Sequence, residues 1–244
     1  MDIRQLVIVA KERDKVVENL CDLFQIKVAF HDPGIIHFGL ENALLPIGNT
    51  FLEVISPVEE NTTAGRFLDR RGGDGGYMVI VQVDDFNLSR KAVENAGIDV
   101  VFESEDPQAR AVHLHPKQLG GAILSLDYMD PPESWKWAGD NWSEEVDTTL
   151  VESISGVQVQ SSDPNEMKRK WQSVLSVNTE IGKSIINLDN TIIEFTEDVD
   201  GRGNGVSAFQ IQANDKDEIN RRAQKMNLLI NNQIEVGGVK FLLS

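Results

Sequence analysis

The chain has 244 residues, of which 41% are hydrophobic, and a formal net charge of −16 at pH 7. This length suits one large domain or two domains of common size, and the hydrophobic share is ordinary for a globular fold. The negative charge argues against binding to a nucleic-acid backbone, because phosphate contacts need clustered lysine and arginine. No stretch reaches the roughly 18 apolar residues of a membrane span, and residues 1–5 lack the features of a signal peptide. We therefore expect a cytoplasmic protein without nucleic-acid or membrane partners.

Short apolar strands alternate with amphipathic helices along the chain. The helices are recognised by apolar side chains that recur at intervals of three and four residues, and the strands by short runs rich in β-branched residues. The expected strand and helix pairs lie, in chain order, at 6–9 with 16–24, 77–83 with 86–96, 157–159 with 167–175, and 206–211 with 219–226. The pattern predicts one strand-helix unit that occurs four times.

Short strands are expected after each helix, and their sequences repeat at long range. Gly48–Val54 matches Asp189–Phe195, and Gly120–Leu124 matches Gly237–Phe241. The two matches occur in the same order in both halves, which indicates that the first two units are duplicated as the last two.

A segment with prolines, a glycine and three tryptophans joins the two halves. Trp135, Trp137 and Trp142 carry large apolar rings that favour burial, whereas proline and glycine interrupt regular structure. We interpret the segment as a connection packed on a domain, with anchoring favoured over a role in ligand binding. The predicted division of the chain is a first domain at 1–128, a connection at 129–149 and a second domain at 150–244.

A strand, a helix and two or three further strands, repeated in pairs, resemble the vicinal oxygen chelate superfamily, which contains glyoxalases, extradiol dioxygenases, epimerases and bleomycin-resistance proteins. The resemblance implies an α+β fold with four tandem βαβββ modules, the last shortened, that form two glyoxalase-like domains of paired modules. In such domains the strands curl around a cavity and the helices cover the outer side.

Local sequence narrows the resemblance to part of the superfamily. Residues 43–57 and 64–72 resemble the first unit of the methylmalonyl-coenzyme A epimerases, and the string His-Pro-Lys at 115–117, followed by two glycines, resembles their last strands. Residues 37–39 are similar to a glyoxalase-like branch. The likeness covers residues 3–128, and the second half adds only the repeat architecture.

The superfamily usually holds a divalent metal with four side chains, and the resemblance places these positions at Gln5, Glu53, Met78 and Ser125. Such an ion prefers carboxylate and imidazole ligands. Only Glu53 is a firm ligand type, Gln5 is acceptable, and a thioether or a hydroxyl fits poorly. We therefore expect a largely dismantled metal site and assign no cofactor, while Glu53 and Gln5 remain weak metal candidates. Gln5, Met78 and Ser125 are expected to contact substrate instead.

Glu53 is the main catalytic candidate. Side chains alternate along a strand, so Phe51, Glu53 and Ile55 share one face, which the resemblance turns toward the cavity. A carboxylate between apolar side chains is desolvated, which raises its pKa and suits it to proton transfer near neutral pH. The alternative is a hydrated glutamate at the cavity mouth without a role. Glu194 is the matching carboxylate of the second half.

Three histidines and a lysine complete the expected site. His113 and His115 lie two residues apart on a predicted strand, so both should face one side and serve a substrate or a metal. His37 aligns with an acidic residue of the epimerases and is a candidate general acid or base. Lys117 offers a positive charge to a phosphate group. The alternative for each histidine is a structural hydrogen bond.

The sequence favours an enzyme of the epimerase, isomerase or lyase type, acting by proton transfer on a small carbonyl or acyl compound such as an acyl-coenzyme A thioester. Glu53 would be the base, His37 or His115 its acidic partner, and Gln5 would polarise the substrate oxygen. One alternative is a non-catalytic binding or resistance protein of the same fold. Another is a metal enzyme that uses Glu53 with His113 or His115. Four units in one chain are compatible with a monomer or a homodimer.

Overall fold

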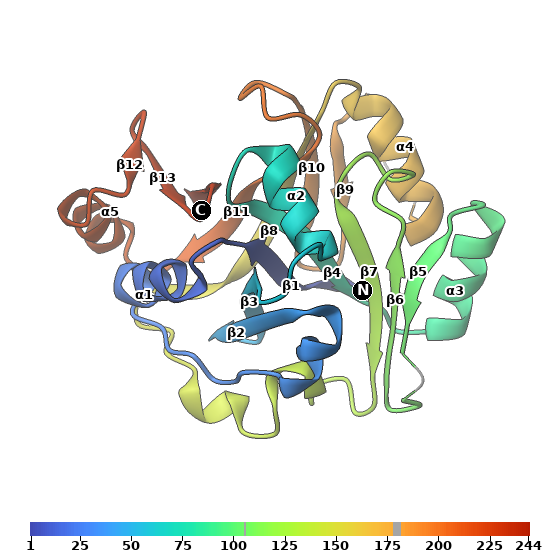
Figure 1. Cartoon of the computed structure of the whole chain (residues 1–244), viewed down its shortest axis with the longest axis horizontal. Helices are drawn as coiled ribbons and strands as arrows, with labels where there is room; N and C mark the ends of the chain where they lie inside the picture. Colours follow the sequence, from blue (N-terminus) through green and yellow to red (C-terminus); the bar gives the residue numbers. More distant parts are fainter. Residues whose placement is uncertain (105, 178–181) are drawn as a thin grey trace.

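The computed structural model describes residues 1–104, 106–177 and 182–244. In these residues one strand-helix-strand arrangement recurs along the chain (Figure 1). No helix of the described ranges combines the length and the apolar character needed to cross a membrane.

The first unit forms one edge of the sheet. Its elements are β1 (Asp2–Val9), α1 (Arg13–Phe24), the 3₁₀ helix η1 (Pro33–Phe38), β2 (Leu40–Ile47) and β3 (Thr50–Pro57), with α2 (Thr63–Arg71) after it. β1 pairs in parallel with β3, and β3 pairs antiparallel with β2. A two-residue turn joins β2 to β3, so Ile47 faces Thr50 across the hairpin.

The second unit continues this sheet. Its elements are β4 (Gly75–Gln82), α3 (Phe86–Asn95), β5 (Val100–Glu103), β6 (Ala109–Leu114) and β7 (Ile123–Met129). β4 pairs antiparallel with β1 and in parallel with β7. The two units therefore share one curved sheet in the order β2-β3-β1-β4-β7-β6-β5.

The second half repeats the plan after two 3₁₀ turns. Its elements are η2 (Lys136–Ala138), η3 (Trp142–Glu145), β8 (Val151–Ser161), α4 (Pro164–Leu175), β9 (Ile185–Asn187), β10 (Ile192–Glu197), β11 (Gly205–Ala213), α5 (Lys216–Lys225), β12 (Leu229–Ile230), β13 (Gln233–Val236) and β14 (Val239–Leu243). Asp163 caps α4 through a 2.9 Å hydrogen bond from the backbone N–H of Glu166. β8 pairs in parallel with β10, and β11 with β14.

The predicted α+β fold of repeated units is confirmed. In each unit the strand before the helix pairs in parallel with the last strand after it, namely β1 with β3, β4 with β7, β8 with β10, and β11 with β14. The strands after α5 contain only 2, 4 and 5 residues.

The two faces of the first sheet have different partners. Leu6 and Leu52 belong to a core that includes Leu20 of α1. Val7 and Phe51 point the other way, into a second apolar cluster. This alternation is the one predicted for β3, and it leaves the second face for a cavity.

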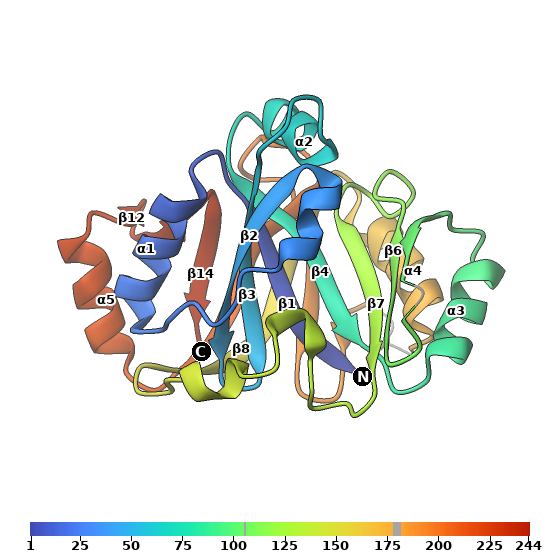
Figure 2. The same cartoon turned by 60° about the horizontal axis from the view of Figure 1, so that its bottom comes forward.

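The halves of the chain are joined through the sheet and the helices. β4 and β11 meet at the bridge between Gly76 and Val206, and the core on the helix side contains side chains from both halves. Figures 1 and 2 show α1 beside α5 and α3 beside α4. Because the sheet and the core are continuous, the division at 1–128, 129–149 and 150–244 stays a prediction.

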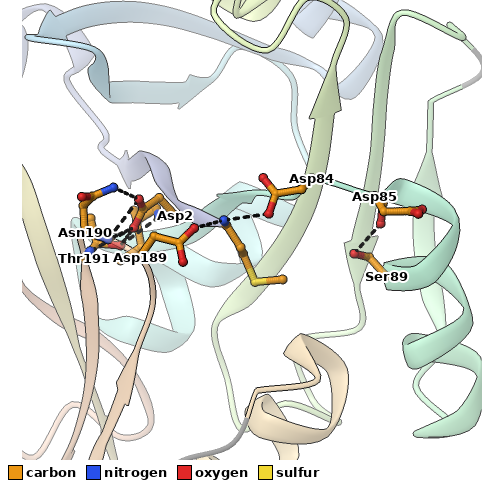
Figure 3. Close-up of polar contacts among 9 residues, drawn as sticks. Asp2, Asp84, Asp85, Ser89, Asp189, Asn190 and Thr191 are labelled. Atoms are coloured by element: carbon orange, nitrogen blue, oxygen red, sulfur yellow. Dashed lines mark hydrogen bonds and ion pairs between the residues drawn. The ribbon is translucent and has the colours of Figure 1, made fainter.

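Polar contacts reinforce this joint. The carboxylate of Asp2 accepts hydrogen bonds from the backbone N–H groups of Asn190 and Thr191 and from the Thr191 hydroxyl, at 2.8 to 3.1 Å (Figure 3). Nη1 of the buried Arg71 donates to the carbonyl oxygens of Arg202 and Gly203, at 2.9 and 2.7 Å. These contacts tie the start of β1 and the end of α2 to the second half.

Candidate functional site

A cavity of about 360 Å³ lies on the sheet face opposite α1 and α3. Side chains of β1, β2, β3, β4, β6 and β7 form its wall, and η1, the first residues of α2 and Trp137 form its edge. Most of the lining is apolar, and the charged side chains in it are Asp32, Glu53 and Asp127. The size suits a small organic molecule.

Glu53 on β3 is buried in this wall, with 7% of its surface exposed. Its Oε1 accepts a hydrogen bond from Nδ2 of Asn42, and its Oε2 accepts one from Nε2 of Gln5, both at 2.7 Å. Burial raises the pKa of Glu53 to about 7, although both hydrogen bonds favour the ionised form. Glu53 therefore changes charge near neutral pH, as a general acid or base must.

The two amides that hold Glu53 have fixed orientations. Oε1 of Gln5 accepts from the indole Nε1 of Trp135, and Oδ1 of Asn42 accepts from the backbone N–H of Asp32, both at 2.8 Å. Indole and backbone N–H groups are donors only, so each amide oxygen faces them and each amide NH₂ faces Glu53. Two neutral donors thus position the carboxylate without supplying a counter-charge.

Asp127 on β7 is a second buried carboxyl in the same cavity, with 2% of its surface exposed. Its Oδ2 accepts from Nε1 of Trp137 at 2.8 Å, and its Oδ1 accepts from the hydroxyl of Ser125. Burial raises the pKa of Asp127 to about 7; the two hydrogen bonds lower it and the charge of Glu53 raises it further. Both carboxyls therefore change charge near pH 7, and in this range each occurs in an ionised and a protonated form.

Aromatic rings form the rim of the cavity. His113 on β6 packs against Phe102, with ring centroids 4.7 Å apart, and burial lowers the pKa of His113 to about 4. Phe102 also meets Phe38 of η1 edge to face at 5.4 Å, and Phe38 is 48% exposed. The aromatic part of the rim is therefore uncharged at pH 7.

A model of the glyoxalase-like domain matches residues 27–175, which is more than half of the chain. This chain belongs to the glyoxalase-like domain family. The matched region runs from the segment before η1 into α4, and so it contains the tryptophan-rich connection as well as most of the cavity wall.

The glyoxalase-like protein is similar over part of its length to curated epimerases. It is 24% identical over 92 residues to mitochondrial methylmalonyl-CoA epimerase of Bos taurus, covering 36% of this chain and 53% of that protein. It is 26% identical over 94 residues to ethylmalonyl-CoA/methylmalonyl-CoA epimerase of Cereibacter sphaeroides, covering 36% and 69%. The chain thus spans about half the length of the bovine relative.

A solved structure shares the fold over almost the whole chain. A triple mutant of 4-hydroxymandelate synthase from Streptomyces coelicolor has a TM-score of 0.69 at 13% identity, covering 93% of this chain and 75% of that one. Together with the family match, this confirms membership of the vicinal oxygen chelate superfamily.

Four of the predicted site residues of the glyoxalase-like protein line the cavity, namely Gln5, Glu53, Met78 and His113. Gln5 was expected to polarise a substrate oxygen, but its amide oxygen and nitrogen are engaged by Trp135 and Glu53. Ser125 was expected to contact substrate. It is fully buried and donates its hydroxyl hydrogen to a neighbouring side chain instead.

The remaining predicted residues lie outside the cavity wall. His37 is exposed on η1, and Lys117 is exposed in the turn after β6. The alternation expected for His113 and His115 does not extend to His115, because β6 ends at Leu114. Nδ1 of His115 accepts instead from the backbone N–H of Lys117 at 3.2 Å. Neither His37 nor His115 therefore lies in the cavity wall with Glu53.

The positions at which the superfamily holds a metal do not form a ligand set in this glyoxalase-like protein. Met78 offers a soft thioether, the hydroxyl of Ser125 is engaged, and Gln5 turns its NH₂ group toward Glu53. A divalent ion needs several oxygen or imidazole lone pairs directed at one point. Of the four superfamily positions, only Glu53 offers a ligand group of this kind. Within the described residues, no three His, Cys, Asp or Glu side chains are placed to share an ion.

Three residues of the site were missed in the sequence. Asp127 follows Ser125 by two positions on β7, so strand alternation alone places it on the cavity face. The two-residue turn of the β2–β3 hairpin sets the register that brings Asn42 next to Glu53, a usable but overlooked signal. No sequence signal indicated Trp137, because its position depends on how the connection packs. The connection thus contributes Trp137 to the cavity wall, while the preference for anchoring over ligand binding stays a prediction.

Trp135→Phe is expected to lower the free energy of unfolding by about 1–3 kcal/mol. Trp135 is fully buried, and the substitution removes the N–H that satisfies the amide oxygen of Gln5. Urea unfolding at pH 7 measures the loss. Trp142→Phe is the matched control, because Trp142 is only partly buried and donates to a backbone carbonyl. Equal losses in the two variants would show that the bond to Gln5 has no special weight.

Proposed function

We propose that this glyoxalase-like protein catalyses proton transfer at the carbon next to a carbonyl group of a small carbonyl or acyl compound, as an epimerase or isomerase does. The observation that carries the proposal is the pair of buried carboxyls, Glu53 and Asp127, which face one largely apolar cavity and whose pKa values are both raised to about 7. Two carboxyls that titrate near pH 7 in one cavity can supply a base and an acid at the same pH.

The chemistry needs only these two groups. The ionised carboxylate, assigned to Glu53, removes the α-proton; the C–H electron pair forms a C–C double bond, and the carbonyl oxygen gains negative charge. The protonated carboxyl, assigned to Asp127, donates a hydrogen bond or its proton to that oxygen. Return of a proton to either face of the carbon completes exchange or epimerisation. The low polarity of the cavity strengthens both interactions.

The similarity to epimerases supports an acyl thioester as one substrate class. The relatives are named for methylmalonyl-CoA and ethylmalonyl-CoA. A cavity of about 360 Å³ takes an acyl group but not a whole coenzyme A thioester. In this proposal the acyl end enters past the aromatic rim, and the rest of the thioester stays outside.

Deuterium exchange tests the reaction. The protein is incubated in D₂O at pH 7.5 with a panel of acyl thioesters and α-hydroxy ketones, and loss of the α-proton signal is followed by NMR. We expect catalysed exchange for at least one compound and none with the doubly substituted Glu53→Gln, Asp127→Asn protein. Equal exchange by the two proteins would contradict the proposal.

A non-catalytic binding protein is the second candidate, favoured by the apolar lining and the rim of Phe38 and Phe102. Thermal-shift measurements with the same panel separate the two candidates. Compounds that raise the melting temperature but show no exchange would establish binding without catalysis.

A further inference from the structure

The cavity contains acidic side chains and no basic ones. None of the described residues that line it is lysine or arginine, whereas Asp32, Glu53 and Asp127 are acidic. His113 is the histidine of the lining, and its lowered pKa of about 4 keeps it neutral at pH 7. The electrostatic potential inside is therefore negative whenever either buried carboxyl is ionised.

The nearby arginines are used elsewhere and are not part of the wall. The guanidinium of Arg4 lies over the ring of Trp135, 5.5 Å from its centroid. Arg13 pairs with Glu41 at 3.0 Å, on the outer side of the hairpin. Arg66 and Arg70 are exposed on α2, near Tyr77 of the wall; Arg66 donates to the carbonyl of Asn61 and the hydroxyl of Thr63, and Arg70 lies over the ring of Phe67. These cations have their own protein contacts or face solvent.

The N–H donors of the wall already face the two buried carboxyls. The single indole N–H of Trp137 serves Asp127, and the NH₂ groups of Gln5 and Asn42 each give one hydrogen bond to Glu53. A buried carboxylate needs a cation or several converging N–H groups to offset its loss of hydration. A second carboxylate brought in by a ligand would find neither here.

We propose that this cavity takes a neutral acyl or carbonyl group with a short aliphatic chain and rejects an acyl group that carries a carboxylate. The inference rests on the proposed function for the reaction at the carbonyl and narrows its substrate class. The selectivity would distinguish this protein from relatives that are named for methylmalonyl-CoA. A methylmalonyl group carries a carboxylate where an isobutyryl group of nearly the same shape carries a methyl group.

Matched ligands test the inference. Isobutyryl and methylmalonyl thioesters of N-acetylcysteamine share one small neutral handle, and their dissociation constants are measured by calorimetry at pH 8. We expect the isobutyryl thioester to bind at least about 10-fold more tightly, since like charges a few ångströms apart in a protein repel by more than 1.4 kcal/mol. Tighter binding of the methylmalonyl thioester, or no binding of the isobutyryl thioester, overturns the inference.

Charge removal checks the cause. Asp127→Asn retains the acceptor for Trp137 and the neighbour of Ser125 but removes one negative charge, so the ratio of the two dissociation constants should shrink several-fold. Glu194→Gln is the matched control, because Glu194 lies outside the cavity wall, and it should leave the ratio unchanged. An unchanged ratio in Asp127→Asn contradicts the inference.

The exchange assay separates this inference from the proposed function. Selective binding of neutral thioesters without α-proton exchange would refute the reaction and leave the selectivity intact. Exchange with a preference for the methylmalonyl thioester would refute the selectivity and leave the reaction intact.

Discussion

Glu53→Gln is expected to lower the rate of α-proton exchange by about 10²- to 10⁴-fold, the contribution of a positioned general base. An amide at this position cannot accept the proton, whereas the strands that form the cavity are held by the backbone ladder and by the core behind it. The measurement is the NMR rate of deuterium incorporation in D₂O with the best substrate of the panel.

Two further variants serve as comparison and control for this prediction. A glutamine at 53 must turn its NH₂ toward the NH₂ of Gln5 or Asn42, so circular dichroism is needed to confirm that the protein is folded. Glu53→Asp keeps the carboxylate but withdraws it by one methylene, and an intermediate rate is expected. Glu194→Gln replaces the matching carboxylate of the second half and should leave the rate unchanged. A wild-type exchange rate in Glu53→Gln would show that another residue is the base.

Asp127→Asn is expected to match the stability of the wild type near pH 4 and to exceed it at pH 8 by about 4 kcal/mol. The folded-state pKa of Asp127, about 7, lies above its ordinary value of 3.8. Between these values the folded protein keeps a proton that the unfolded chain has lost, so wild-type stability falls as the pH rises through this window. At 1.36 kcal/mol for each pKa unit, a shift of roughly three units gives the expected difference. Asparagine removes this dependence.

Other groups shape the curve in known directions. The pKa of Glu53 is raised from 4.5 to about 7, so Glu53 also lowers stability as the pH rises through that range. The pKa of His113 is lowered from 6.5 to about 4, so between these values His113 acts in the opposite direction, and its contribution is lost as the pH falls. Urea unfolding from pH 4 to pH 8 measures the net effect. Glu60→Gln, at an exposed carboxylate, is the control. Parallel curves of unfolding free energy against pH for wild type and Asp127→Asn would contradict the prediction.

The candidate site was predictable to the extent that strand periodicity controls it. Alternation around Glu53 correctly indicated a carboxyl in the cavity wall, and the same rule, carried from Ser125 to the next position on that face, would have indicated Asp127. The rule failed for His115 because the position of a strand end depends on the following turn. The orientation of Gln5 could not be predicted, because Trp135 of the distant connection engages its amide oxygen and so turns its NH₂ group toward Glu53.

The sequence by itself determined the repeated strand-helix unit and the face on which Glu53 lies, because side-chain periodicity and turn chemistry are local properties of a chain. Only the tertiary structure decided that Trp135 and Trp137 contact Gln5 and Asp127, and that two carboxyls from different units line one largely apolar cavity. These contacts join residues more than a hundred positions apart, or depend on the path of an irregular segment. The raised pKa values of Glu53 and Asp127 follow from that packing, since burial is a property of the assembled fold and not of any single strand.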